Sequence, residues 1–265
     1  MTTTWDLMAL LMLIGAVWGS FLNVCIHRIP AEENVVVTPS HCPKCQQRIA
    51  WYDLIPILSW LILGGRCRHC QERISLVYPL VEFTAALLTV ATLHHFGINQ
   101  TGIALTILGY ALITLTVIDL YHYILPDVIT LPGIALGLIC TWIPGFNPPM
   151  AHWQDAWIGV IAGGGGLWLF GWLFQRITGK EGMGLGDVKL TAMLGAWLGW
   201  KALPFTIFAA AVIGSVVGLL WIALSGRDRT LPIPFGPYLA LGAWGYLHFG
   251  PMVYSWYLGR PLVLF

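Results

Sequence analysis

The sequence predicts an all-α, polytopic membrane protein with about eight transmembrane helices and one long polar loop. The first observation is composition. Hydrophobic residues make up 57% of the chain and charged residues 9%, whereas a soluble domain carries about 25% charged residues. The second is that the apolar residues fall into separate runs long enough to cross a bilayer. The third is a polar stretch over 27–76 that holds six of the 13 Lys and Arg residues.

The first apolar run, Leu7–Ile26, has 20 residues without a charge, which is enough for a membrane-spanning helix. We expect it to be retained, because no basic segment precedes it and no small-residue cleavage site stands out. The remaining runs predict seven further spans, at 77–95, 102–120, 127–145, 156–175, 187–200, 203–225 and 231–250. The span at 127–145 contains Pro132, and the span at 187–200 is short. The predicted divisions are therefore a first helix at 1–26, a loop at 27–76 and a helical core at 77–265.

The distribution of Lys and Arg predicts the topology. If the long loop is cytoplasmic, the cytoplasmic loops and adjoining helix ends hold eleven Lys and Arg residues, and the opposite side holds only Lys201 and Arg260. This bias is the expected one for cytoplasmic loops and places the N-terminus outside. It also places Asp119, Asp127 and Asp187 at cytoplasmic helix ends. Because the topology rests on Lys and Arg alone, the common location of these three acids is an independent result.

Two aspartates are the candidate catalytic residues. Asp119 ends the third predicted span, and Asp187 opens the sixth after three alternating glycines. A charge near the middle of a span costs about 2.5–3.5 kcal/mol, so such residues are functional candidates by default. Two carboxylates in one site can share a proton, so that the neutral one polarises a carbonyl while the ionised one activates water.

A structural role for these acids stays open. Each could be a solvated charge or a helix cap, and Asp127 after Pro126 fits a cap well. Lys189, two residues beyond Asp187, should face away from it on a helix. The sequence does not decide whether Glu82 anchors the helix at the membrane interface or belongs to a second site.

Four cysteines predict a metal site in the polar loop. Cys42 and Cys45 form one C-x2-C pair, Cys67 and Cys70 form another, and 21 residues separate the pairs. This spacing is typical of a zinc ribbon, in which four thiolates hold a structural zinc ion. Two disulfides are the alternative, but a cytoplasmic loop disfavours them. The loop also contains several acids, so we expect no nucleic-acid binding.

Glycines 163–166 lie inside the fifth predicted span. No strand precedes them and no Gly-Lys-Ser/Thr follows, so a phosphate loop is excluded and close helix packing is favoured.

The sequence resembles bacterial type IV prepilin peptidases, which also act as N-methyltransferases. Motifs spread over most of the chain carry the resemblance, and their combination is more specific than Gly-x-Gly-Asp alone, which other intramembrane aspartyl proteases share. The matching segments are Gly19–Pro30, the two cysteine pairs, Trp51–Pro56, Leu58–Trp60, Ile74–Ser75, Tyr78–Glu82, Ile118–Asp119, Leu125–Asp127, the Gly-x-Gly-Asp ending at Asp187 with Lys189–Leu190, and Pro234–Pro237.

The resemblance implies a specific enzyme in the bacterial inner membrane, with its active site facing the cytoplasm. Asp119 and Asp187 would be the catalytic pair of an aspartyl peptidase. It would remove the basic leader of prepilins or of type II secretion pseudopilins after a glycine. The enzyme would then methylate the new N-terminal residue with S-adenosylmethionine. The loop at 27–76 would be linked with methylation and 77–265 with peptidase activity, while the residues that bind the methyl donor stay unknown.

Two other classes of protein remain as alternatives. Asp119 and Asp187 could bind or relay cations in a membrane transporter or channel. The cysteine loop could instead recruit a partner to a membrane-anchored scaffold. Membrane lipids surround the chain in every case, and the sequence does not give its oligomeric state.

Overall fold

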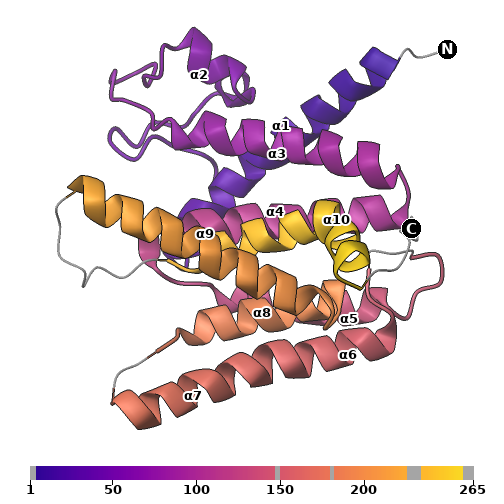
Figure 1. Cartoon of the computed structure of the whole chain (residues 1–265). Helices are drawn as coiled ribbons and strands as arrows, with labels where there is room; N and C mark the ends of the chain where they lie inside the picture. Colours follow the sequence, from indigo (N-terminus) through magenta and orange to yellow (C-terminus); the bar gives the residue numbers. More distant parts are fainter. Residues whose placement is uncertain (1–3, 147–149, 180–181, 226–233, 259–265) are drawn as a thin grey trace. The chain divides into compact units, whose positions relative to one another are not determined.

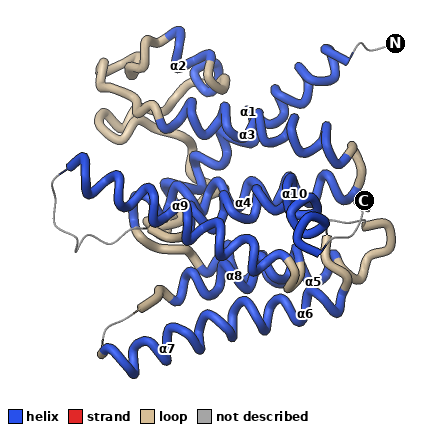
Figure 2. The backbone as a smooth tube through the Cα atoms, viewed as in Figure 1, coloured by secondary structure: helices blue, strands red, loops and turns tan. Residues whose placement is uncertain are grey.

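The structure is a computed structural model that describes residues 4–146, 150–179, 182–225 and 234–258. These residues form helices joined by loops and contain no strand, only two isolated β-bridges (Figure 2). The chain divides into two compact units, residues 1–114 and 115–265. The elements are α1 (Thr4–Arg28), η1 (Trp51–Leu54), α2 (Leu58–Ile62), α3 (Val77–Phe96), α4 (Gln100–His122), α5 (Asp127–Cys140), α6 (Trp153–Val160), η2 (Ile161–Gly165), α7 (Gly166–Thr178), α8 (Leu185–Leu198), α9 (Ala202–Ser225) and α10 (Gly236–Leu258).

The predicted all-α membrane class is confirmed, but eight spans are not. Among the residues that the structure describes, five helices are long and apolar enough to cross a membrane: Trp5–Arg28, Val77–Phe96, Gln100–His122, Trp153–Thr178 and Ala202–Leu224. By contrast, α5 and α8 have 14 residues each, or about 21 Å of helix, against a hydrocarbon core of about 30 Å. The predicted run at 127–145 thus ends early, at Cys140. The loops carrying Lys180, Arg227 and Arg229 lie outside the described residues.

In the first unit, α1 packs against α3, and the two helices cross in the view of Figure 1. Glycine makes this approach possible: an added Cβ would lie 2.7 Å from Ala86 Cα at Gly15 and 2.6 Å from Glu82 Cα at Gly19. Small residues at such positions let helix backbones come close in a membrane. Trp18 of α1 also stacks on Tyr110 of α4, with ring centroids 6.0 Å apart.

In the second unit, α8 is enclosed by its neighbours. All nine residues from Leu190 to Leu198 are buried. Helices α5 and α6 lie against it, and Gly159 and Gly195 bring the α6 and α8 backbones into direct contact. The Trp197 indole donates a hydrogen bond of 2.8 Å to the Gly133 carbonyl of α5. A short helix held on several sides in this way gives Asp187, in its first turn, a fixed position.

In the glycine run at 163–166, the first three glycines belong to the π-helical turn η2 that joins α6 to α7, and Gly166 is the first residue of α7. The predicted role in helix packing is confirmed at Gly163, where an added Cβ would lie 2.8 Å from the Thr191 carbonyl oxygen. Gly165 and Gly166 face open space instead. Only part of the run therefore serves packing.

Candidate functional site

Asp119 lies in the last turn of α4 and is buried, with 5% of its surface exposed. Its Oδ2 atom accepts a hydrogen bond of 2.9 Å from the backbone N–H of Gly236. Gly236 is the first residue of α10, so this N–H has no partner within its own helix. The N-terminus of a helix also carries a partial positive charge that attracts a carboxylate. The start of α10 therefore orients Asp119.

Asp187 is the third residue of α8 and is half-buried. Its Oδ2 atom lies beside Gly184, where an added Cβ would be 3.3 Å away, and Gly184 is the extended N-cap residue of the helix. An acid at the third helical position is the one that reaches back to the cap in a capping box. Asp187 thus stands where a carboxylate can cap its own helix.

The two aspartates belong to the same unit, residues 115–265. Leu125, at the end of the loop between α4 and α5, links their surroundings. An added Cβ would lie 3.0 Å from Leu125 Cβ at Gly186 and 3.1 Å from Leu125 Cδ2 at Gly236. Neither glycine leaves room for a side chain, so the first turns of α8 and α10 both close around Leu125. The start of α8, which carries Asp187, and the start of α10, which binds Asp119, therefore share Leu125 as a neighbour.

Asp127, whose role the sequence left open, opens α5 and pairs with Lys189 of α8. Asp127 Oδ1 and Lys189 Nζ are 2.6 Å apart. Lys189 thus faces away from Asp187, as predicted. The pair joins the first turns of two helices and lies beside the aspartate site.

The four loop cysteines come together in the first unit. Their sulfur atoms all lie within 4.8 Å of one another, and Cys42 Sγ is 3.8 Å from Cys70 Sγ. Four sulfurs bound tetrahedrally at about 2.3 Å from zinc are about 3.8 Å apart. The cysteines are free rather than disulfide-bonded, so the donor set fits zinc.

Hydrogen bonds support the cysteine cluster. Backbone hydrogen bonds, that with Cys70 foremost, lower the pKa of the Cys67 thiol to about 7. Arg68 donates two hydrogen bonds to Asp53, of 2.8 and 2.6 Å, and thereby lowers the pKa of that carboxyl. The thiolate form that a metal needs is therefore favoured at Cys67.

Two buried polar residues tie the loop to the helices of the first unit. The guanidinium of Arg28, at the end of α1, donates to four loop carbonyls, the shortest bond being 2.8 Å to Thr38. Glu82 of α3 accepts a hydrogen bond of 2.7 Å from the Ile57 N–H. Glu82, undecided from the sequence, is thus a buried acceptor that holds the loop against α3.

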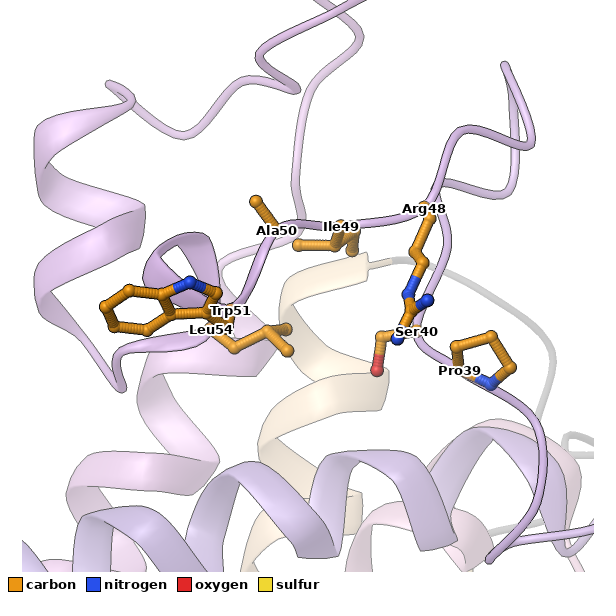
Figure 3. Close-up of a pocket in the computed structure, with 7 residues that line it drawn as sticks. All are labelled: Pro39, Ser40, Arg48, Ile49, Ala50, Trp51 and Leu54. Atoms are coloured by element: carbon orange, nitrogen blue, oxygen red, sulfur yellow. The ribbon is translucent and has the colours of Figure 1, made fainter.

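A hollow of ≈ 410 Å³ opens in this loop. Figure 3 shows Trp51 and Leu54 at one end of it and Arg48, Ser40 and Pro39 at the other. It is thus apolar at one end and cationic at the other.

Sequence reasoning missed two partners of the aspartates. Gly184 entered the sequence analysis only as one of the three alternating glycines before Asp187, and Gly236 only within the segment Pro234–Pro237. The extended N-cap before Asp187 could have been inferred from an acid at the third helical position. No local signal links Gly236 to Asp119, which is 117 residues away.

These features together define a polytopic helical membrane protein with paired aspartates at helix ends and a four-cysteine loop. Residues 13–96 match the family described as the bacterial peptidase A24 N-terminal domain, and residues 106–219 match the type IV leader peptidase family. No solved structure matches the chain significantly.

Relatives match over nearly the whole chain. A prepilin leader peptidase/N-methyltransferase of Pseudomonas aeruginosa is 40% identical, covering 93% of this chain and 91% of the relative. Proteins with the same description from Aeromonas hydrophila and Pectobacterium carotovorum are 41% and 42% identical, with 96% and 86% of this chain covered and 94% and 88% of the relatives. The chain therefore belongs to the type IV leader peptidase family, which confirms the predicted resemblance and enzyme class.

Proposed function

We propose that this chain removes the basic leader of type IV prepilins or type II secretion pseudopilins after a glycine. It would then methylate the new N-terminal residue. The observation that carries the peptidase proposal is that the start of α8, which holds Asp187, and the start of α10, which binds Asp119, both adjoin Leu125 in one unit. Relatives at about 40% identity are described as prepilin leader peptidase/N-methyltransferases, which supports both the peptidase and the methyltransferase activity.

The proposed chemistry is hydrolysis by two carboxylates that share one proton. The ionised carboxylate accepts a proton from water while the water oxygen bonds to the scissile carbonyl carbon. The neutral carboxylic acid donates its proton to the carbonyl oxygen. Breakage of the C–N bond then passes a proton to the leaving amine. The backbone contacts from Gly236 and Gly184 would hold Asp119 and Asp187 in place for these steps.

We place the site at the cytoplasmic face of the bacterial inner membrane. The excess of Lys and Arg on one side of the predicted topology supports this orientation. A prepilin-like substrate has an apolar helix and a basic leader, so its cleavage site would reach the depth of helix ends such as those carrying Asp119 and Asp187. The negative charge there would attract the leader.

We assign the loop at 27–76 to a zinc-stabilised region linked with methylation, and 77–265 to the peptidase core. Cys42, Cys45, Cys67 and Cys70 would hold a structural zinc ion, because four thiolates leave no open coordination position for chemistry. S-adenosylmethionine would supply the methyl group. The residues that bind it are not assigned.

Mass spectrometry of a prepilin-like substrate, incubated with the purified protein with and without S-adenosylmethionine, tests the proposal. We expect loss of the leader in both cases and one added methyl group only with the donor. Asp119→Asn and Asp187→Asn should each slow cleavage at least about 100-fold, since each removes an acid/base group.

Asp155→Asn is the matched control. Asp155 binds Trp200 and Lys201 beyond the opposite end of α8, so cleavage should continue. Wild-type cleavage by the Asp187→Asn variant would refute the aspartate pair. An intact substrate together with aspartate-dependent ion flux in proteoliposomes would instead favour the transporter alternative.

A further inference from the structure

The loop segment Trp51–Ile62, which contains η1 and α2, turns its polar groups inward and its apolar groups outward. Ser59 is buried and donates a 3.0 Å hydrogen bond to the Tyr52 carbonyl. By contrast, Trp51, Leu61 and Ile62 are 79%, 59% and 77% exposed. A segment that faces water normally shows the reverse pattern.

The segment is fastened beside the entry of a membrane-spanning helix. The Ile57 N–H, just before α2, donates to the Glu82 carboxylate at 2.7 Å. Glu82 lies five residues beyond Val77, the first residue of α3, which corresponds to about 7.5 Å along the helix. Because α3 is apolar and long enough to span, the start of α2 lies at the level where that helix enters the bilayer.

The strained backbone at Ile57 indicates that surrounding contacts hold the segment in this position. Ile57 has a φ of +62° and a ψ of −51°, the conformation of a γ-turn with positive φ, which is rare and strained and unfavourable for a β-branched residue. Such strain persists only where surrounding contacts hold it. The bond to Glu82 and the bond from Trp60 Nε1 to the Ile74 carbonyl, of 3.2 Å, fix the segment on both sides of the bend.

The charge of the loop indicates that lipid covers the exposed apolar side chains of the segment. Between residues 27 and 76 the loop carries six Lys and Arg residues against four acids, and a basic excess of this kind attracts anionic lipid headgroups. The hollow of Figure 3 has Trp51 and Leu54 at one end and Arg48 at the other. An anionic phospholipid has the matching chemistry, with an acyl chain at one end and a phosphate at the other.

We propose that Trp51–Ile62 is a monotopic membrane anchor, lying in the boundary between headgroups and acyl chains, with anionic phospholipid as its ligand. Aromatic residues and short apolar faces flanked by basic residues favour this depth. The anchor holds the four-cysteine loop against the membrane surface. This inference requires only that the chain lies in a membrane and does not depend on the proposed activities.

Depth-dependent quenching in the full-length protein tests the anchor. A genetically encoded fluorescent residue replaces Leu61, and the protein is reconstituted in vesicles containing anionic lipid. We expect nitroxide-labelled lipid to remove most of the Leu61 fluorescence, while aqueous iodide has little effect. The same label at Leu80, exposed on α3, gives the lipid reference. The label at Gln47, exposed near the first cysteine pair, gives the aqueous reference.

Two results would overturn the proposal. Quenching of the Leu61 label by iodide, as at Gln47, would place the segment in water. Protection from both quenchers would mean that protein covers it. A further variant that combines Leu61→Glu and Ile62→Glu carries the label at Leu58. It should lose lipid quenching and gain iodide quenching, whereas Gln47→Glu should leave both unchanged. Unaltered lipid quenching in the double variant would also contradict the anchor.

Discussion

The cysteine loop and the helix that carries Asp187 hold their functional groups in opposite ways. Among residues 29–76, only Cys42, Ser59 and Gly65 are buried. In α8, nine consecutive residues are buried. The loop therefore depends on polar ties from Arg28 and Glu82, and on any metal its thiols bind, whereas α8 depends on close backbone packing. Changes that weaken one region should spare the other.

The largest expected effect is loss of the metal from the loop. Cys42→Ser removes one thiolate of four, and structural zinc contributes about 10–16 kcal/mol of apparent binding free energy in small zinc-folded peptides. We expect zinc, measured by elemental mass spectrometry, to fall well below one ion per chain, and the loop to become sensitive to protease. The helices of 115–265 should stay protected.

Cys140→Ser is the matched control, because Cys140 is a free thiol in α5 outside the cluster. It should keep the wild-type metal content. Unchanged zinc in Cys42→Ser would refute the metal site.

The next effect lies in α8. Gly195→Ala would place a Cβ directly against the Gly159 carbonyl group, where only backbone can move. Overpacking of a well-filled core costs about 1–3 kcal/mol or more. Thermal unfolding should therefore show a clear loss of stability in 115–265, with zinc content unchanged. Gly165→Ala, at a helical glycine that faces open space, should cause no loss. Equal stability of the two variants would contradict the close packing.

The third expected effect is a local loosening of the loop when its hydrogen bond to Glu82 is removed. Glu82→Ala removes the acceptor of the Ile57 N–H, and a hydrogen bond to a charged group contributes about 1.5–3 kcal/mol. We expect faster proteolysis between residues 50 and 63, while Glu82→Gln, which keeps an acceptor oxygen, has a smaller effect. Glu33→Ala, an exposed loop acid, should match the wild type. Unchanged proteolysis in Glu82→Ala would show that the bond does not hold the loop.

Local patterns in the sequence predict the helices and the cysteine cluster well. The runs of apolar residues locate every long helix, because burial in lipid requires continuous apolar length. The C-x2-C pairs predict the cluster, because each pair already brings two thiols together. The sequence does not show how deeply a helix is buried in the protein: the runs at 127–145 and 187–200 predict spans, one with Pro132 inside it and the other short, whereas α8 is a short helix enclosed by protein.

For the same reason, the sequence predicts the surroundings of only one of the two aspartates. The acid at the third position of α8 is a local signal, and the capping contact to Gly184 follows from it. The contact from Gly236 to Asp119 depends on how α4 and α10 fold together, so no spacing rule contains it. The strained turn at Ile57 is likewise imposed by Glu82, 25 residues away.

The smallest expected effect is at the Asp127–Lys189 pair, which sharpens the contrast between polar ties and backbone packing. The two side chains are 56% and 34% exposed, and exposed ion pairs contribute about 0–1 kcal/mol. Because Gly133 and Gly137 of α5 already pack closely against Met193 and Trp197 of α8, a double-mutant cycle with Asp127→Ala and Lys189→Ala should give a coupling energy below about 1 kcal/mol. A coupling of several kcal/mol would mean that the pair, rather than the glycine contacts, fastens the two helices together.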